Sequence, residues 1–222
     1  MTNVRSISDC YLYGICDLGY VEKGDLLRVA ESMIQGGVDL IQLRAKQATL
    51  DDLTQLAARL HKLTAAASIP LIINDHAEIA SRVPVEGVHV GQDDLAIASV
   101  RQRVGRPIWL GKSTHSLDQA VAAEGENADY IGFGPIFATP TKPDYVPVGL
   151  GHIAAVHRRV RLPMFCIGGI KLENLDRVIE AGGQRVVIVS GLLQATDITA
   201  YARACKDRLA SLAATAAEGS RF

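Results

Sequence analysis

Cysteine is scarce in this sequence of 222 residues, and its four cysteines are spread along the chain at Cys10, Cys16, Cys166 and Cys205. No pair has C-x-x-C spacing, and no cysteine has a histidine partner at zinc-finger spacing. The pattern therefore argues against a structural metal site and against a disulfide framework. Because free cysteine is one of the most frequently buried residue types, we expect four reduced and mostly buried thiols.

Long apolar runs and an excess of charge of one sign are also missing. No run of eighteen apolar residues occurs, and the opening MTNVRSISDCYL lacks the basic start and cleavage site of a signal peptide. The 23 Lys and Arg nearly balance the 24 Asp and Glu, for a formal net charge of −1. We therefore expect a cytoplasmic protein with no membrane and no nucleic-acid partner, whose anion binding depends on local clusters.

What the chain does have is a regular alternation of short apolar runs with longer segments of helical period. We expect the strands to be residues 11–15, 40–43, 71–74, 87–90, 108–111, 130–133, 164–167 and 186–189. Between them, residues 50–67 repeat leucine and alanine at spacings of three and four, which is typical of an amphipathic helix.

Eight strand–helix units in about 220 residues predict an α/β fold of the (β/α)8 TIM-barrel type. No composition break divides the chain, so residues 1–222 are expected to form a single domain, with a frayed tail over about 215–222. A doubly wound open sheet is the alternative. It usually has fewer strands at this length, and no G-x-G-x-x-G follows the first strand.

Polar or glycine-rich groups follow seven of the eight predicted strands, where a barrel carries its catalytic groups. In the second strand, Gln42, Arg44 and Lys46 alternate with Leu43 and Ala45, so three polar side chains leave on one side of the chain. The third strand ends in Asn74-Asp75, the fourth in a G-Q-D-D stretch, and the fifth in Lys112-Ser113.

The charged groups among these suggest a magnesium diphosphate as ligand. Arg44, Lys46 and Lys142 are cations that would project toward one mouth of the barrel, which implies a ligand of high negative charge. Asp75 and Asp94 would repel that ligand unless a hard cation lay between them. Mg²⁺ is typically bound by one or two carboxylates together with substrate phosphates.

A second anion site is predicted at the ends of the seventh and eighth strands. Gly168-Gly169 and Ser190-Gly191 offer backbone N–H groups there, and barrels often bind a substrate phosphate at this position. Two phosphate sites argue for two small-molecule phosphorylated substrates.

The stretch WLGKSTHS resembles the end of an ATP-binding P-loop, but the spacing is wrong. Five residues rather than four lie between Gly105 and Gly111, and they include most of a predicted strand. A P-loop NTPase is thus a weak alternative. Nearby, His89 is expected to be a packed strand residue, and His76 and His115 are expected to be loop histidines.

Several segments together resemble the thiamine-phosphate synthase family. They are IQLRAK, LIINDHAEIA, GVHVGQDDL, GKSTHS, GPIFATPTKPDYVPVGL, CIGGI and VVIVSGL, in this order along the chain. The resemblance implies a TIM barrel that joins 4-amino-5-hydroxymethyl-2-methylpyrimidine diphosphate to hydroxyethylthiazole phosphate, giving thiamine phosphate and pyrophosphate. It also implies a dissociative reaction in which diphosphate leaves before the thiazole nitrogen attacks, so no protein nucleophile is needed.

The same resemblance implies a role for individual residues. Those expected to bind the pyrimidine diphosphate are Gln42, Leu43, Arg44, Ala45, Lys46, Asn74, Ser113 and Lys142. Those expected to bind the thiazole phosphate are Thr139, Pro140, Thr141, Gly169, Val189 and Ser190. Asp75 and Asp94 are expected to hold Mg²⁺ as the cofactor, and the catalytic work is assigned to Lys142, Ser113, Arg44 and Lys46, which would stabilise the departing diphosphate.

Two alternatives from other functional classes stay open at this point. A thiazole tautomerase-like barrel would bind only the thiazole partner, and it would not need Arg44, Lys46, Asp75, Asp94 and Lys142. A non-catalytic sensor of phosphate ligands would retain the barrel without the chemistry. The sequence also leaves a homo-oligomer open.

Overall fold

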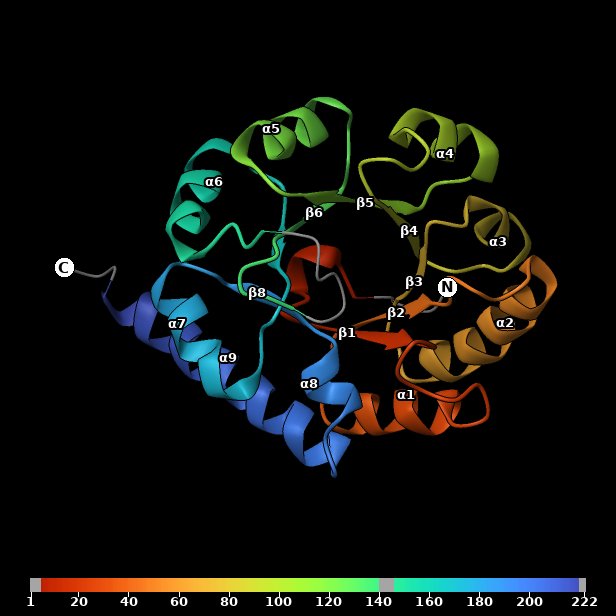
Figure 1. Cartoon of the computed structure of the whole chain (residues 1–222), viewed down its shortest axis with the longest axis horizontal. Helices are drawn as coiled ribbons and strands as arrows, with labels where there is room; N and C mark the ends of the chain where they lie inside the picture. The colour runs from red at the N-terminus through yellow and green to blue at the C-terminus, as the bar shows by residue number, and fades with distance from the viewer. Residues whose placement is uncertain (1–4, 140–145, 220–222) are drawn as a thin grey trace.

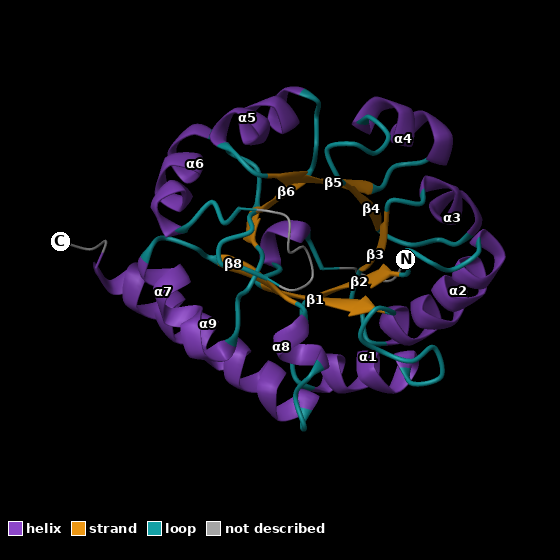
Figure 2. Ribbon diagram, in the orientation of Figure 1, coloured by secondary structure: helices purple, strands orange, loops and turns teal. Residues whose placement is uncertain are grey.

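The computed structural model, which describes residues 5–139 and 146–219, contains a closed barrel of parallel strands in sequence order. The strands are β1 (Leu12–Asp17), β2 (Leu40–Arg44), β3 (Leu71–Asn74), β4 (Gly87–Val90), β5 (Trp109–Thr114), β6 (Tyr130–Phe133), β7 (Met164–Cys166) and β8 (Arg185–Ile188). β8 pairs with β1, which closes the ring seen in Figures 1 and 2. The predicted (β/α)8 TIM barrel is confirmed.

Helices surround the ring on its outer side (Figure 2). They are α1 (Leu26–Gln35), α2 (Leu50–Ala66), α3 (Ala77–Arg82), α4 (Ile97–Val104), α5 (Leu117–Gly125), α6 (Ile153–Arg159), α7 (Leu175–Glu180), α8 (Ser190–Leu193) and α9 (Ile198–Gly219). Short 3-10 turns lie at η1 (Ile7–Asp9), η2 (Leu150–His152) and η3 (Leu172–Asn174). None of the helices in the described ranges combines the length and the apolar character needed to cross a membrane.

Helix α2 shows how the local sequence sets these elements. Thr49 caps its first turn, because its hydroxyl accepts a hydrogen bond from the Asp52 N–H at 3.2 Å. Leu53, Leu56 and Leu60 lie on one face and are buried against the barrel.

The barrel wall separates two hydrophobic cores. The larger core lies between strands and helices and receives the outward-facing strand residues, such as Leu43, Val88 and Ile131. The smaller one fills the barrel interior with Tyr13, Leu40, Ile72, Tyr130 and Phe165, among others. Because successive strand residues point to opposite sides, most strands contribute to both cores, whereas β4 adds no apolar residue to the interior one.

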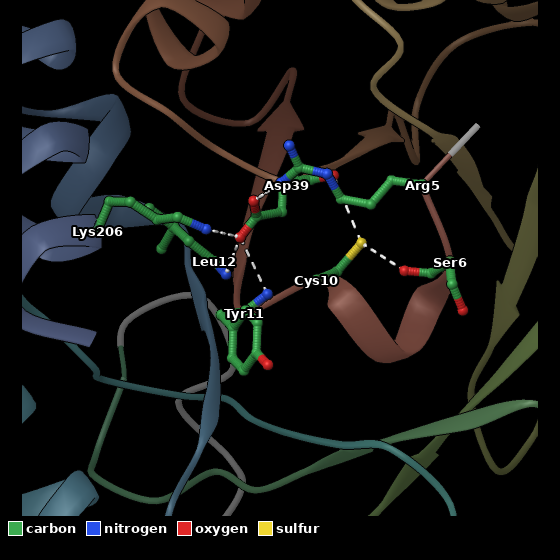
Figure 3. A network of polar contacts seen from close by, with 7 residues as sticks. All are labelled: Arg5, Ser6, Cys10, Tyr11, Leu12, Asp39 and Lys206. Carbon is green, nitrogen blue, oxygen red and sulfur yellow. Dashed lines mark hydrogen bonds and ion pairs between the residues drawn. The ribbon is translucent and has the colours of Figure 1, made fainter. Parts of the chain in front are cut away.

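The amino end of the barrel is closed by η1, the short red helix inside the ring in Figure 1. Ile7 of η1 and the adjacent Cys10 are buried in the interior core. The Cys10 thiol donates to the carbonyl oxygens of Ser6, at 3.4 Å, and Asp39, at 3.6 Å (Figure 3). Burial raises the pKa of this thiol to about 12.

Asp39 is the centre of a charged network at this end (Figure 3). Its side chain is 1% exposed and pairs with both Arg5 and Lys206. One of its oxygens also accepts the backbone N–H groups of Tyr11 and Leu12, both at 3.0 Å. A single buried carboxylate thereby joins the N-terminal segment, β1 and α9.

The structure differs from the sequence expectations at a few boundaries. β1 continues two residues past residue 15 to Asp17, and β5 continues past residue 111 to Thr114. Helix α9 runs to Gly219 and residues 220–222 lie outside the described ranges, so the fraying expected over about 215–222 stays a prediction. All four cysteines are free and buried, as predicted.

Candidate active site

A pocket of about 110 Å³ lies inside the barrel. Its lining includes eight of the residues predicted from the sequence, namely Gln42, Arg44, Asn74, Ser113, Thr139, Gly169, Val189 and Ser190. These residues come from, or directly follow, strands β2, β3, β5, β6, β7 and β8 at their carboxyl ends. The structure therefore brings residues of both predicted phosphate sites to a single pocket.

The β2 side of the pocket is built by strand alternation. Gln42 and Arg44 point into the pocket, whereas Leu43 and Ala45 pack in the core between barrel and helices. Any contact of Leu43 or Ala45 with a substrate would therefore be made by the backbone. Lys46 lies at the rim, with its side chain 57% exposed.

Arg44 is held by a partner that sequence reasoning missed. Its guanidinium donates to Asp17 at 2.5 Å, and Asp17 is itself 2% exposed at the end of β1. The second Asp17 oxygen accepts the Gly19 N–H at 2.9 Å. This buried pair fixes the position of the guanidinium and leaves its remaining N–H donors available to an anion in the pocket.

Asp75 and Asp94 meet at the rim, beside Lys46. The two carboxyl groups lie within hydrogen-bonding reach of one another, and the Lys46 ammonium is 4.0 Å from an Asp75 oxygen. Asp75 has a φ of 64°, an unusual value for a residue with a side chain, and its N–H donates to the His89 carbonyl at 2.8 Å. Asp94 accepts the Gly91 N–H at 2.6 Å.

The carboxylates of Asp75 and Asp94 repel one another when both are ionised. Burial and the neighbouring Asp94 raise the pKa of Asp75 above its ordinary value. For Asp94, burial acts to raise the pKa, but the hydrogen bond from Gly91 and the one shared with Asp75 outweigh it, and the pKa is lowered. Two carboxylates this close favour either one bound proton or a cation between them.

The rim carboxylates fit a magnesium ion better than a transition metal. In residues 5–139 and 146–219, no three His, Cys, Asp or Glu side chains converge as a metal-binding cluster. Two carboxylates without soft ligands suit Mg²⁺, which takes its other ligands from water and phosphate. Asp75 and Asp94 are the residues that would hold it.

Ser113 on β5 lies next to His89 on β4, which was expected to be a packed strand residue with no part in the site. His89 is 9% exposed, lines the pocket and lies 3.0 Å by its Nε2 from the Ser113 hydroxyl. The expectation for His89 was thus incomplete: it is buried in its strand, but it faces the site. Two glycines are the sequence signal that could have identified it: Gly111, which pairs with His89 on the adjacent strand β5, and Gly132 on β6, where a Cβ would lie 3.4 Å from the His89 ring.

The opposite wall carries the second predicted anion site. Gly168 and Gly169 have φ values of 95° and 64°, and a Cβ on Gly169 would lie 2.7 Å from the Phe137 side chain. The Gly168 carbonyl accepts the Phe137 N–H at 3.0 Å, and the Gly169 carbonyl accepts from the Asn174 side chain at 2.9 Å. The loops after β6 and β7 are therefore packed together, with Thr139 at the pocket wall.

The remaining predicted residues divide into three groups. Pro140, Thr141 and Lys142 lie outside the described residues. His115 lines the pocket and bonds the Gly134 carbonyl through Nδ1, whereas His76 precedes helix α3 and is not part of the pocket lining. Lys112 points away from the pocket and is 6% exposed.

Comparison with known proteins places this architecture in one family. The model of the family described as thiamine monophosphate synthase matches residues 12–192. The chain belongs to this family. The thiamine-phosphate synthase of Shouchella clausii is 44% identical over 194 residues, covering 87% of this chain and 93% of that one. The enzyme of that name from Chloroflexus aurantiacus is 40% identical over 202 residues, covering 90% and 93%.

A solved structure of the same family shares the fold. The thiamine phosphate pyrophosphorylase from Pyrococcus furiosus superposes with a TM-score of 0.84 at 25% identity, over 91% of this chain and 96% of that one. Membership confirms the family to which the sequence motifs pointed. The structure argues against the P-loop alternative, because Gly111, Lys112 and Ser113 lie inside strand β5 rather than in a phosphate-binding loop.

Proposed function

We propose that this member of the thiamine monophosphate synthase family joins 4-amino-5-hydroxymethyl-2-methylpyrimidine diphosphate to hydroxyethylthiazole phosphate, in the cytoplasm, releasing pyrophosphate. The observation that carries the proposal is that Arg44, Asn74 and Ser113 line one pocket, while the Asp75–Asp94 pair begins at the residue directly after Asn74. Opposite it, Gly169 and Ser190 line the same pocket and suit a second phosphate. One pocket thus offers a site for each substrate.

The chain's residues supply electrostatic rather than nucleophilic catalysis. Burial raises the pKa values of the Cys16, Cys166 and Cys205 thiols to about 12, and none of them lines the pocket. Arg44, held by Asp17, and the Ser113 hydroxyl are preorganised donors for the oxygens on which charge grows as the diphosphate departs. Mg²⁺, bound by Asp75 and Asp94, would neutralise part of the same charge.

Gln42 and Asn74 suit the pyrimidine, because each carries an amide that can both donate to and accept from a ring nitrogen or an amino group. Both line the pocket next to Arg44. A ring held there would lie between the donors for the leaving group and the wall that would hold the thiazole phosphate. This placement supports an in-line attack by the thiazole nitrogen on the carbon that loses diphosphate.

The test is an assay of pyrophosphate and thiamine phosphate with the full chain. We expect both products only when the two substrates and Mg²⁺ are supplied together. Reactions that lack one substrate, or that contain ATP alone, serve as controls. Absence of both products in the complete mixture would refute the proposal, and isomerisation of a thiazole phosphate without the pyrimidine partner would favour the tautomerase instead.

A further inference from the structure

A continuous line of hydrogen bonds crosses the barrel interior from β2 to β5. The Gln42 side-chain N–H donates to the Tyr13 hydroxyl at 2.6 Å, and that hydroxyl is 3.3 Å from the hydroxyl of Tyr130. The Tyr130 oxygen is 3.2 Å from His89 Nδ1, and His89 Nε2 is 3.0 Å from Ser113 Oγ. The line therefore begins and ends on residues predicted to bind the pyrimidine diphosphate.

The residues of this line are placed for these contacts and packed around them. In register, His89 pairs with Gly111, and Gly111 with Tyr130. A Cβ on Gly111 would lie 2.4 Å from His89 Nδ1 and 2.2 Å from the Tyr130 ring, so only glycine admits both rings. The Tyr13 and Tyr130 rings also contact Phe165 edge-on, at centroid distances of 5.4 and 5.6 Å.

The hydrogen bonds of the line have a preferred direction. In the amide orientation that the structure gives Gln42, the side-chain nitrogen faces Tyr13, and because this nitrogen can only donate, the Tyr13 oxygen accepts from it. Burial raises the pKa values of Tyr13 and Tyr130 above their ordinary value, so both hydroxyls keep their protons at neutral pH. If Tyr13 donates to Tyr130 and Tyr130 donates to His89 Nδ1, both buried tyrosine protons have an acceptor.

The opposite direction leaves one buried group unsatisfied. If Ser113 donated to His89 Nε2, then Nδ1 would carry the proton and donate to Tyr130, which would in turn donate to Tyr13. The Tyr13 proton would then have no acceptor among its contacts in the described part of the chain. An unsatisfied buried donor costs about 1–3 kcal/mol, which selects the first direction.

We propose that His89 is a positioning residue that, through the line from Gln42 to Ser113, holds its proton on Nε2 and makes Ser113 donate into the pocket. Because Nε2–H donates to Ser113 Oγ, the serine's own proton is directed away from His89. It is thereby available to an oxygen of the departing diphosphate. The functional part of this inference rests on the proposed function, whereas the tautomer of His89 can be tested without it.

The tautomer is read directly by nitrogen-15 NMR of the imidazole groups in the uniformly labelled full chain. His89→Gln identifies the His89 resonances by their loss. We expect a protonated Nε2 and an unprotonated Nδ1 in His89, and we expect Tyr130→Phe to shift the population toward the other tautomer. A protonated Nδ1 in the unmodified protein would overturn the inference, whatever the enzyme assay shows.

The catalytic consequence is tested by a double-mutant cycle between His89 and Ser113. In the assay of the proposed reaction, we expect His89→Leu to lower kcat by about tenfold while KM changes less than about threefold, since the donated proton matters most in the transition state. His89→Gln keeps an N–H near the Nε2 position and should recover most of the loss. In a Ser113→Ala background, His89→Leu should have almost no further effect.

Equal losses from His89→Leu with and without Ser113 would show a merely structural role and overturn the proposal. Melting temperatures of each variant separate loss of fold from loss of function.

Tyr130→Phe should cost more activity than Tyr13→Phe, because Tyr130 can still donate to His89 when the Tyr13 hydroxyl is missing. Tyr11→Phe, at the opposite end of the barrel, is the matched control and should leave kcat unchanged. An inactive unmodified protein would refute the proposed function and leave the NMR result to decide the tautomer.

Discussion

Two carboxylate sites lie at opposite ends of the barrel, and the charges that surround them differ. At the amino end, the Asp39 carboxylate is surrounded by two cations and two backbone N–H groups (Figure 3). At the carboxyl end, Asp75 faces a second carboxylate, that of Asp94, and its ion-pair partner among the described residues, Lys46, is 4.0 Å away and largely exposed.

The comparison separates stability from function. The charge of Asp39 is balanced by its own chain, so this end requires no ligand to be complete. Among the described residues, the charges of Asp75 and Asp94 are balanced only in part, which is compatible with the proposed binding of a cation and an anionic substrate at this end. Barrel folds divide their two ends in this way: residues of the amino-terminal face stabilise, and those of the carboxyl-terminal face act on ligands.

The largest effect is expected on stability, at the amino end of the barrel. Asp39→Ala leaves Lys206 and two backbone N–H groups without their acceptor, so we expect the free energy of unfolding to fall by about 3 kcal/mol. Urea unfolding measures this change. The kcat of the folded fraction should stay at the wild-type value, and a tenfold lower kcat would contradict the division between the two ends.

Asp25→Ala is the matched control for that experiment. Asp25 pairs with Arg28 three residues away on the exposed face of α1, with side-chain exposures of 52% and 69%. An exposed pair of this kind contributes less than about 1 kcal/mol. A loss as large as that of Asp39→Ala would show that burial is not the reason for the effect at the amino end.

At the mouth, the expected effect is on turnover. Asp75→Ala should fold normally and lose at least about tenfold in kcat/KM, because the site loses one of its two cation ligands. Asp93→Ala, in the same loop as Asp94 but outside the predicted ligand set, should retain activity. Full activity of Asp75→Ala in the pyrophosphate assay would show that the assigned role is wrong.

Mg²⁺ itself should stabilise the protein through the same pair. At a Mg²⁺ concentration ten times the dissociation constant, we expect about 1.4 kcal/mol of added stability, which corresponds to a rise of about 3 °C in melting temperature. Thermal denaturation with and without the ion measures it. Asp75→Asn should show little of this shift, and an equal shift in the variant would place the ion elsewhere.

The smallest effect is the pH dependence of the same pair without Mg²⁺. The pKa of Asp75 is raised above its ordinary value of 3.8, so the folded protein binds this proton more tightly than the unfolded chain does. The stabilisation is complete below pH 3.8 and is lost as the pH rises through the raised pKa. Urea unfolding across this range should therefore show wild type losing stability relative to Asp75→Asn, and a constant difference would contradict it.

The bounds of a strand were predicted well from the sequence where an apolar run spans the whole strand. The bounds predicted for β3, β4 and β6 match those of the structure, whereas β1 and β5 extend further, to Asp17 and Thr114. Polar residues at the ends of those two strands point into the mouth or lie beside it, so hydrophobicity alone stops too early. Helix α9 reaches Gly219 in the alanine-rich C-terminal segment, in line with the high helix propensity of alanine, and the fraying expected over about 215–222 stays a prediction.

Site residues could be predicted where their position along one strand identifies them. They could not be predicted where their role depends on a contact with a residue of another strand. Alternation identified Gln42 and Arg44, and the positions of the strand ends identified Asn74 and Ser113, all of which line the pocket. Asp17 and the pocket-facing role of His89 were missed. Each is a single polar residue of a strand, and its significance depends on a partner 27 or 24 residues away.

Gly111 gives the barrel a constraint on how its sequence can vary. Its missing side chain is the space in which the rings of His89 and Tyr130 lie, on the two strands that flank β5. Any larger residue at position 111 therefore has to be accompanied by smaller ones at positions 89 and 130. Three positions separated by up to 41 residues in the chain are expected to change together across descendants of this sequence, or not at all.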